Sequence, residues 1–126
     1  MKTVKYYYTT PLITFSGIYL KDYPQAVIAE SKIKPGIRYT FAAVYDEDSK
    51  TIKFGMAKCN PEDKFVKAIG REIAEKHAET NPFYVIENFS GIRNDYADEV
   101  MEVMLKQEAK LLKRDYPGCF NDRISD

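Results

Sequence analysis

Three groups of side chains in this sequence could bind an anionic ligand, and the first is a basic stripe in a helical segment. Lys64, Lys67 and Arg71 are spaced i, i+3 and i+7, so a helix would place them on one side. Gly70 lies beside them and leaves room for a ligand to approach closely. Arg71 could bind two phosphate oxygens at once. The stripe is therefore either a docking face for phosphate or a solvated helix face with i,i+4 ion pairs.

The second group follows that segment and combines aromatic rings with polar residues. Phe83 and Tyr84 precede a glycine, after which come Arg93 and Asn94. Asn94 is a reasonable N-cap, and the free backbone N–H groups of a helix N-terminus bind anions. One of the rings could stack on a nucleotide base. The alternative is that Asn94 only caps the helix, Arg93 is a surface residue and the rings belong to the core.

The third group is a set of cations near the C-terminal end of the same helix. Lys110, Lys113 and Arg114 lie in its last turns, and Arg123 follows. The helix dipole favours positive charge there without any ligand. Of these cations, we assign Arg114 to the predicted ligand site.

Catalysis and metal binding have little support in the sequence. His77 is the only histidine, and the two cysteines, Cys59 and Cys119, are far apart. No P-loop, nucleophile elbow or zinc-ligand spacing is present. We therefore predict no catalytic residue, no metal and no cofactor.

The composition narrows the class of protein further. The 126 residues include 19 basic and 19 acidic side chains, and this zero balance argues against a protein that coats long nucleic acid. The N-terminal residues have no apolar signal-peptide core, and no stretch is long and apolar enough for a membrane span. We expect one cytoplasmic domain covering residues 1–126, with free thiols and no membrane partner.

Strand signals fill the N-terminal half and helix signals follow. Residues 37–45 and 51–59 flank the polar turn DEDSK and predict a hairpin. Ile52, Phe54 and Met56 alternate with more polar positions, which indicates one buried face. The other predicted strands are residues 3–10, 12–20, 25–30 and 83–90, with a turn at 34–36.

Two amphipathic helices complete the predicted fold. Asn60 as N-cap and Pro61 as first residue predict the start of the first helix, and Asn81-Pro82 predicts its end. Its apolar arc consists of Phe65, Val66, Ile69, Gly70, Ile73 and His77. The second helix, from about Asp95 to Tyr116, has an apolar arc wider than half its circumference, which either the first helix or a second copy of the chain must cover. We expect an α+β fold, an antiparallel sheet packed with two C-terminal helices, and a homodimer.

Nine residues of the first helical segment resemble a motif of small phage-encoded proteins. They are Cys59, Pro61, Asp63, Phe65, Lys67, Gly70, Arg71, Ile73 and Ala74. With the order of strands and helices, the motif resembles the Thoeris anti-defence family of signal-sequestering sponge proteins. The resemblance implies a protein that is not an enzyme, that oligomerises, and that binds a cyclic ADP-ribose-type immune signal without cleaving it.

A signal of that kind requires phosphate donors, a stacking ring and a polar contact to the base. We expect it to lie at a dimer interface built from the two helices. The predicted ligand-binding residues are Lys67, Arg71, Phe83, Tyr84, Arg93, Asn94 and Arg114.

Two other functions are compatible with the sequence. One is an anti-CRISPR-like inhibitor that contacts a bacterial defence protein directly through the acidic stretches DEDSK and YADEVMEVM. The other is a small enzyme that cleaves a nucleotide signal. Substitution of Arg71 distinguishes the anti-CRISPR-like inhibitor from a sponge, because only a sponge needs a side chain that donates hydrogen bonds to phosphate at that position.

Overall fold

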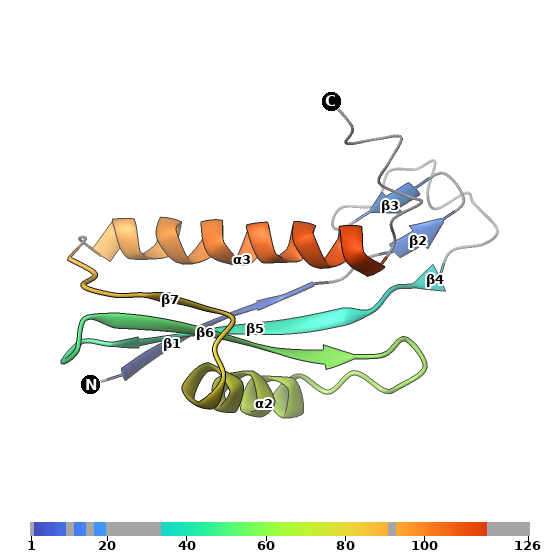
Figure 1. The fold of residues 1–126 in the computed structure, drawn as a ribbon. Coiled ribbons are helices and arrows are strands. Elements are labelled where there is room, and N and C mark those ends of the chain that lie inside the picture. The colour runs from blue at the N-terminus through green and yellow to red at the C-terminus, as the bar shows by residue number, and fades with distance from the viewer. Residues whose placement is uncertain (1, 10–11, 15–16, 20–33, 91–92, 116–126) are drawn as a thin grey trace.

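The computed structural model describes residues 2–9, 12–14, 17–19, 34–90 and 93–115 (Figure 1). The strands are β1 (Lys2–Tyr8), β2 (Leu12–Thr14), β3 (Gly17–Tyr19), β4 (Lys34–Pro35), β5 (Arg38–Asp46), β6 (Thr51–Cys59) and β7 (Tyr84–Ile86). The helices are α2 (Lys67–Thr80) and α3 (Arg93–Asp115). The expected α+β fold, with an antiparallel sheet and two helices, is confirmed.

A four-stranded antiparallel sheet in the order β1-β5-β6-β7 forms the centre of the protein. The predicted hairpin is confirmed, since β5 pairs with β6 from Arg38↔Cys59 to Asp46↔Thr51. In its turn the Asp46 carboxylate accepts a hydrogen bond from the Asp48 backbone N–H at 3.0 Å. A small second sheet, in the order β3-β2-β4, precedes β5 in the chain.

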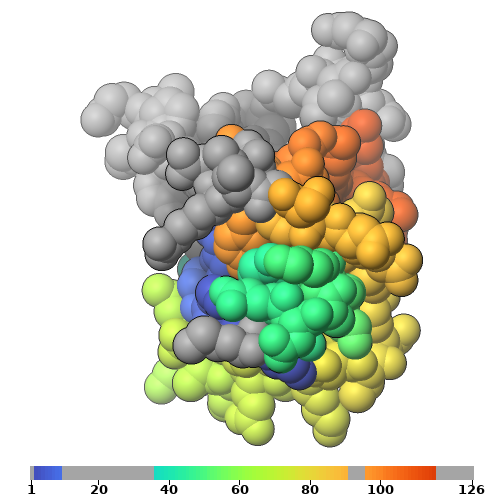
Figure 2. Space-filling view, turned by 90° about the vertical axis from the view of Figure 1, so that its left-hand side faces the viewer, coloured from blue at the N-terminus to red at the C-terminus, as the bar shows by residue number. Residues whose placement is uncertain are grey.

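The helices lie on opposite faces of the central sheet, with α3 above it and α2 below it in Figure 1. Figure 2 shows the same three layers from the side, with the β5–β6 turn between the two helical layers. Because side chains alternate along a strand, each strand presents one set of residues to α3 and another to α2. The helix α2 therefore does not cover the apolar arc of α3.

The face toward α3 carries large side chains. Phe41, Ile52 and Phe54 are completely buried there, together with Val100 and Met104 from α3. The predicted buried face of residues 52–56 is confirmed for Ile52 and Phe54. This aromatic and aliphatic layer holds α3 on the sheet.

Where β5 and β6 meet α2, the other face of the sheet carries small side chains instead. Ala42 and Ala57 of the sheet pack against Ala74 of α2. A Cβ atom added to Gly55 would lie 2.1 Å from the backbone oxygen of Ala74 and 2.3 Å from the backbone nitrogen of Ala78. The backbones of β6 and α2 are therefore in direct contact, and only glycine fits at position 55.

The predicted start of the first helix is wrong by several residues. Helix α2 begins at Lys67 with Val66 as N-cap, and residues 60–66 form a loop. The Cys59 thiol donates to backbone oxygens of this loop, at 3.6 Å for Asn60 and 3.8 Å for Asp63. The loop carries Phe65 away from the helix axis, onto Tyr8 and Arg38. The predicted end is confirmed, since α2 stops at Thr80 and Asn81 is its C-cap.

The predicted apolar face of this helix is also wrong. The residues that α2 buries are Ala74 and Ala78, whereas Ile69 is 56% and Ile73 is 40% exposed. The physical reason is the close backbone contact at Gly55, which admits small side chains but leaves no room for isoleucine.

Three other sequence predictions have different outcomes. In the turn predicted at 34–36, Lys34 and Pro35 form strand β4, and the strand predicted over 83–90 is shortened to Tyr84–Ile86. The strand predicted at 25–30 lies outside the described residues.

Within the described ranges, no helix is both long and apolar enough to cross a bilayer.

Candidate functional site

A cleft opens at the edge of the central sheet, next to the start of β7. Strand β7 pairs only with residues 52–54 of β6, while β6 continues to Cys59. The cleft, which we call the Phe83 cleft, has a volume of about 470 Å³. Its lining residues are Tyr39, Met56, Lys58, His77, Asn81, Pro82, Phe83 and Arg114. They come from both helices, two strands and the turn after α2.

Phe83 forms an aromatic wall of this cleft. The Asn81-Pro82 turn returns the chain to the sheet, where the Phe83 backbone N–H donates to the Phe54 oxygen at 2.9 Å. Its ring lies 5.8 Å from that of Phe41 and 6.0 Å from that of Phe54. These core rings hold Phe83 in place and leave it half-buried, so that it contacts both the core and the cleft.

Arg114 approaches the cleft from the last turn of α3 in a fixed orientation. Its Nη2 donates to the Tyr39 hydroxyl at 3.0 Å, and its Nε donates to the Asp115 carboxylate at 3.2 Å. The Tyr39 hydroxyl in turn donates to Asp115 at 2.7 Å. Burial and this hydrogen bond raise the pKa of Tyr39 to about 12, so the hydroxyl keeps its proton at neutral pH. The guanidinium retains further N–H donors for a ligand, because it has five in total.

His77 and Lys58 add polar groups on the β6 side. The His77 Nδ1 lies 2.7 Å from the Met56 backbone oxygen, which can only accept, so Nδ1 carries a proton and Nε2 is left for other contacts. Lys58 is opposite Tyr39 in the β5–β6 register, which places both side chains on the same face of the sheet. The cleft thus combines a ring, two cations and an imidazole, an arrangement suited to an aromatic ligand that carries phosphate.

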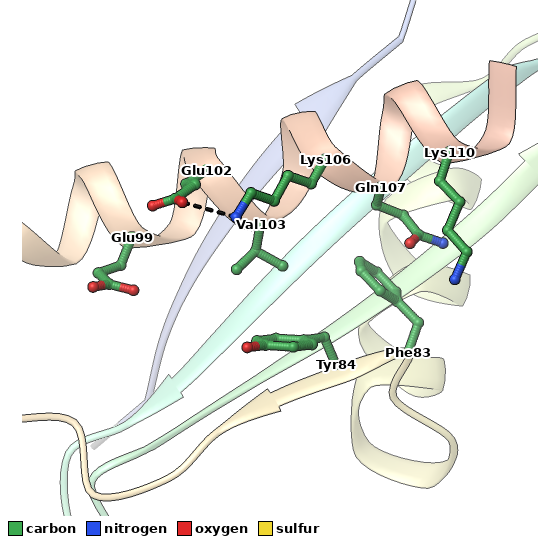
Figure 3. A pocket seen from close by; sticks show the side chains of 8 residues that line it. All are labelled: Phe83, Tyr84, Glu99, Glu102, Val103, Lys106, Gln107 and Lys110. Atoms are coloured by element: carbon green, nitrogen blue, oxygen red, sulfur yellow. Dashed lines mark ion pairs between the residues drawn. The ribbon is translucent and has the colours of Figure 1, made fainter. Parts of the chain in front are cut away.

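A second hollow of about 330 Å³ adjoins the cleft and shares Phe83 with it (Figure 3). Tyr84 lies on its floor and is half exposed, while Gln107 and Lys110 extend from α3 toward Phe83. Lys106 is paired with Glu102 at 2.9 Å, so its charge is already balanced. Because Glu99 and Glu102 also line this hollow, it could hold only an uncharged part of a ligand whose phosphate lies in the Phe83 cleft.

Lys67 and Arg71 lie on the other face of the sheet, away from the cleft. The Lys67 Nζ is 5.0 Å from the centre of the Tyr8 ring, and the Arg71 Cζ is 5.6 Å from that of Tyr6. Tyr6 also donates a hydrogen bond to Glu75. Both cations are exposed, and both are stacked on rings of the edge strand β1.

Arg93 and Asn94 are in the first turn of α3, and their side chains lie outside the described part of the structure. The twenty residues from Asn94 to Arg114 span about 30 Å of helix. One small ligand cannot contact both ends within one chain. Of the seven predicted residues, the structure therefore brings together Phe83, Tyr84 and Arg114, and separates the other four from them.

Sequence reasoning missed Lys58, His77 and Asn81 as parts of the site. Lys58 continues the apolar register of Ile52, Phe54 and Met56, and a lysine in that register indicates a place where the buried face becomes open. His77 was expected on the apolar arc of its helix, but it is exposed. His77 forms its hydrogen bond with the Met56 backbone oxygen, which is accessible because β7 does not pair with that part of β6. The sequence does not reveal where β7 lies, so this bond could not be predicted.

The described residues contain no cluster of three or more histidine, cysteine, aspartate or glutamate side chains that could hold a metal ion. No protein-family model, no curated protein and no solved structure matches the chain significantly. The site geometry and the sequence motif are thus the basis for a functional proposal.

Proposed function

We propose that the protein binds a phosphate-bearing nucleotide signal in the Phe83 cleft and sequesters it without cleaving it. The observation that carries this proposal is the juxtaposition of the Phe83 ring with the oriented guanidinium of Arg114 in one cleft. A volume of about 470 Å³ is within the range of small-molecule sites, roughly 300 to 1,000 Å³.

The charge of the cleft supports an anionic ligand. Lys58 and Arg114 contribute positive charge to the cleft, that of Arg114 being shared with Asp115, and the lining residues include no carboxylate. Asp115 pairs with Arg114 from one side and orients it. The neutral net charge of the whole chain means that this attraction is local, which suits a small anion better than long nucleic acid.

The resemblance to the Thoeris anti-defence family supports a cyclic ADP-ribose-type signal as the ligand. An adenine-like base would stack on Phe83, and a phosphate would accept hydrogen bonds from Arg114 and Lys58. Asn81 carries both an amide donor and an amide acceptor for the polar edge of a base. Binding without cleavage requires only these contacts.

The experiment is thermal melting with cyclic ADP-ribose isomers, cyclic di- and trinucleotides, and linear ADP-ribose. A ligand at a thousandfold excess over its dissociation constant stabilises the fold by about 4 kcal/mol. One cyclic compound should raise the melting temperature and be recovered intact after the protein is heat-denatured. A shift with none of these compounds, or recovery of a cleaved product, would contradict the proposal.

A matched pair of variants locates the site. Arg114→Ala removes a cation from the cleft, and Arg71→Ala removes the same side chain from the opposite face of the sheet. We expect Arg114→Ala to abolish the ligand-induced shift and Arg71→Ala to leave it. The reverse result would assign binding to the basic stripe of α2 and overturn the role of the Phe83 cleft.

An acidic hollow favours a second candidate, inhibition by protein–protein contact. Its volume is about 360 Å³, and its lining includes Glu87, Asp98, Glu99 and Glu102. A basic segment of a defence protein would be its ligand. In that case the double variant Glu99→Gln/Glu102→Gln would abolish inhibition, whereas Arg114→Ala would not.

A further inference from the structure

The edge of β6 that borders the Phe83 cleft has no partner strand over its last residues. Strand β7 pairs with residues 52–54 of β6, and the Phe83 backbone N–H adds one more hydrogen bond, to the Phe54 oxygen at 2.9 Å. Strand β6 itself continues to Cys59. In the described part of the sheet, only β5 and β7 are neighbours of β6. The main chain of residues 55–59 therefore lacks a strand partner on the cleft side.

The alternation of an antiparallel ladder decides which main-chain groups face this edge. The N–H and C=O of one residue point to the same side of the strand, and those of the next residue point to the other side. Because the Phe54 oxygen faces β7, the N–H and C=O of Met56 and Lys58 face the same edge. The far side of the sheet agrees with this assignment. The Thr9 N–H donates to the Tyr39 oxygen at 3.0 Å, so the main chain of Tyr39 is directed at β1 and not at Lys58, its partner in register.

Lys58 presents a backbone donor and a backbone acceptor side by side at this edge. The preceding oxygen of the row, that of Met56, is already bonded to the His77 ring at 2.7 Å. The Lys58 side chain lies on the α3 face of the sheet, opposite Tyr39, and the Tyr39 hydroxyl accepts a hydrogen bond from Arg114 at 3.0 Å. The two cations of the cleft are thus on the α3 side, and the main-chain pair of Lys58 lies at the edge of the sheet.

We propose that the backbone N–H and C=O of Lys58 bind the polar edge of the base, while the side chains of Lys58 and Arg114 bind the phosphate. This inference rests on the proposed function. An ionised phosphate only accepts hydrogen bonds, so it has no donor for the C=O. A base with an amino group beside a ring nitrogen, such as adenine or cytosine, supplies a donor for the C=O and an acceptor for the N–H. The cleft therefore selects nucleotides that carry an amino-substituted base.

A proline at position 58 removes the N–H, and Lys58→Ala is its matched control because it removes the same ammonium group and keeps the N–H. Since this N–H points away from β5, Lys58→Pro leaves the β5–β6 ladder intact, which its melting temperature verifies. The probes are cyclic ADP-ribose isomers, cyclic di- and trinucleotides, and linear ADP-ribose. With any of them that stabilises the wild type, Lys58→Pro should bind at least about fivefold more weakly than Lys58→Ala. Equal affinities would overturn the main-chain contact and leave the proposed function in place, whereas a wild type that binds none of the probes would overturn both.

Amide hydrogen exchange, measured by NMR, tests the same geometry in the wild type. Without a nucleotide, the Lys58 amide should exchange at least about tenfold faster than those of Gly55 and Ala57, which are directed at β5. A bound probe should slow the exchange of Lys58 at least about fivefold. A Lys58 amide that is protected in the free protein, or that a bound probe leaves unchanged, would contradict the proposal.

Discussion

Substitution of Gly55 by alanine should destabilise the fold, because the added methyl group would collide with the backbone of α2. The new Cβ would lie 2.1 Å from the Ala74 backbone oxygen, whereas an ordinary contact begins at 3.4 Å. Helix α2 would have to move away from β6 by roughly 1.3 Å along that line. A gap of 0.5 to 1 Å already loses about a quarter to a half of the dispersion energy of each contact.

The expected loss of stability is about 3 kcal/mol, the upper end of the usual range for an overpacked core. In urea denaturation this corresponds to a midpoint lower by about 1 to 3 M, with an m-value of about 1 to 3 kcal/mol per molar. Because the clash is with backbone atoms, truncation of the neighbouring side chain cannot relieve it. The double variant Gly55→Ala/Ala74→Gly should therefore be no more stable than Gly55→Ala.

Gly70→Ala is the matched control. Its Cβ would lie 2.5 Å from the Thr40 hydroxyl oxygen, a side-chain atom that rotation about χ1 can move. Alanine in a helix interior is also favoured over glycine by about 1 kcal/mol. We expect Gly70→Ala to change the free energy of unfolding by about 1 kcal/mol or less. Equal stability of Gly55→Ala and Gly70→Ala would refute the argument that α2 and β6 are in backbone contact.

Two further predictions concern pH and a surface ion pair. The pKa of tyrosine is about 10 in the unfolded chain, and that of Tyr39 in the folded protein is about 12. The protonated hydroxyl of Tyr39 therefore contributes its full stabilisation below pH 10. This stabilisation is lost as the pH rises toward 12. Urea melts from pH 9 to 12 should fall less steeply for Tyr39→Phe than for the wild type, and parallel curves would exclude this role. Glu102→Gln breaks the Lys106–Glu102 pair, whose side chains are 76% and 61% exposed, and should leave the unfolding free energy unchanged within the error of the measurement. A measurable loss of stability would show that this pair is more than a solvated contact.

The fold class and the hairpin could be predicted because local signals determine them. Alternating residues in β5 and β6, the polar turn between them and Asn81-Pro82 at the end of α2 all act over a few residues. The orientation of α2 could not be predicted in this way. Its apolar arc indicated that Ile69 and Ile73 are buried, but one glycine on a strand distant in sequence decides which side of the helix fits.

The candidate site was only partly predictable for a related reason. Phe83, Tyr84 and Arg114 were identified from their chemistry, and they do lie in adjoining hollows. The sequence carried no signal that α2 and α3 pack on opposite faces, so Lys67 and Arg71 were grouped with residues on the far side of the sheet. His77 and Lys58 became site residues because β7 starts opposite Phe54 and leaves the rest of β6 uncovered, which is a property of the assembled sheet.

The difference between the two faces of the sheet also protects the register of its strands. A slip of one residue between β5 and β6 exchanges the faces of every side chain in the moved strand. Phe54 would then be directed at the backbone of α2, where only glycine fits, and Gly55 would leave a void beneath α3. Incorrect pairings are thus penalised on both faces at once, by collision on one and by lost packing on the other. The sheet needs no specific side-chain pair to select its alignment, because β5 and β6 have room only for small residues where they meet α2, while Phe41, Ile52 and Phe54 fill their other face.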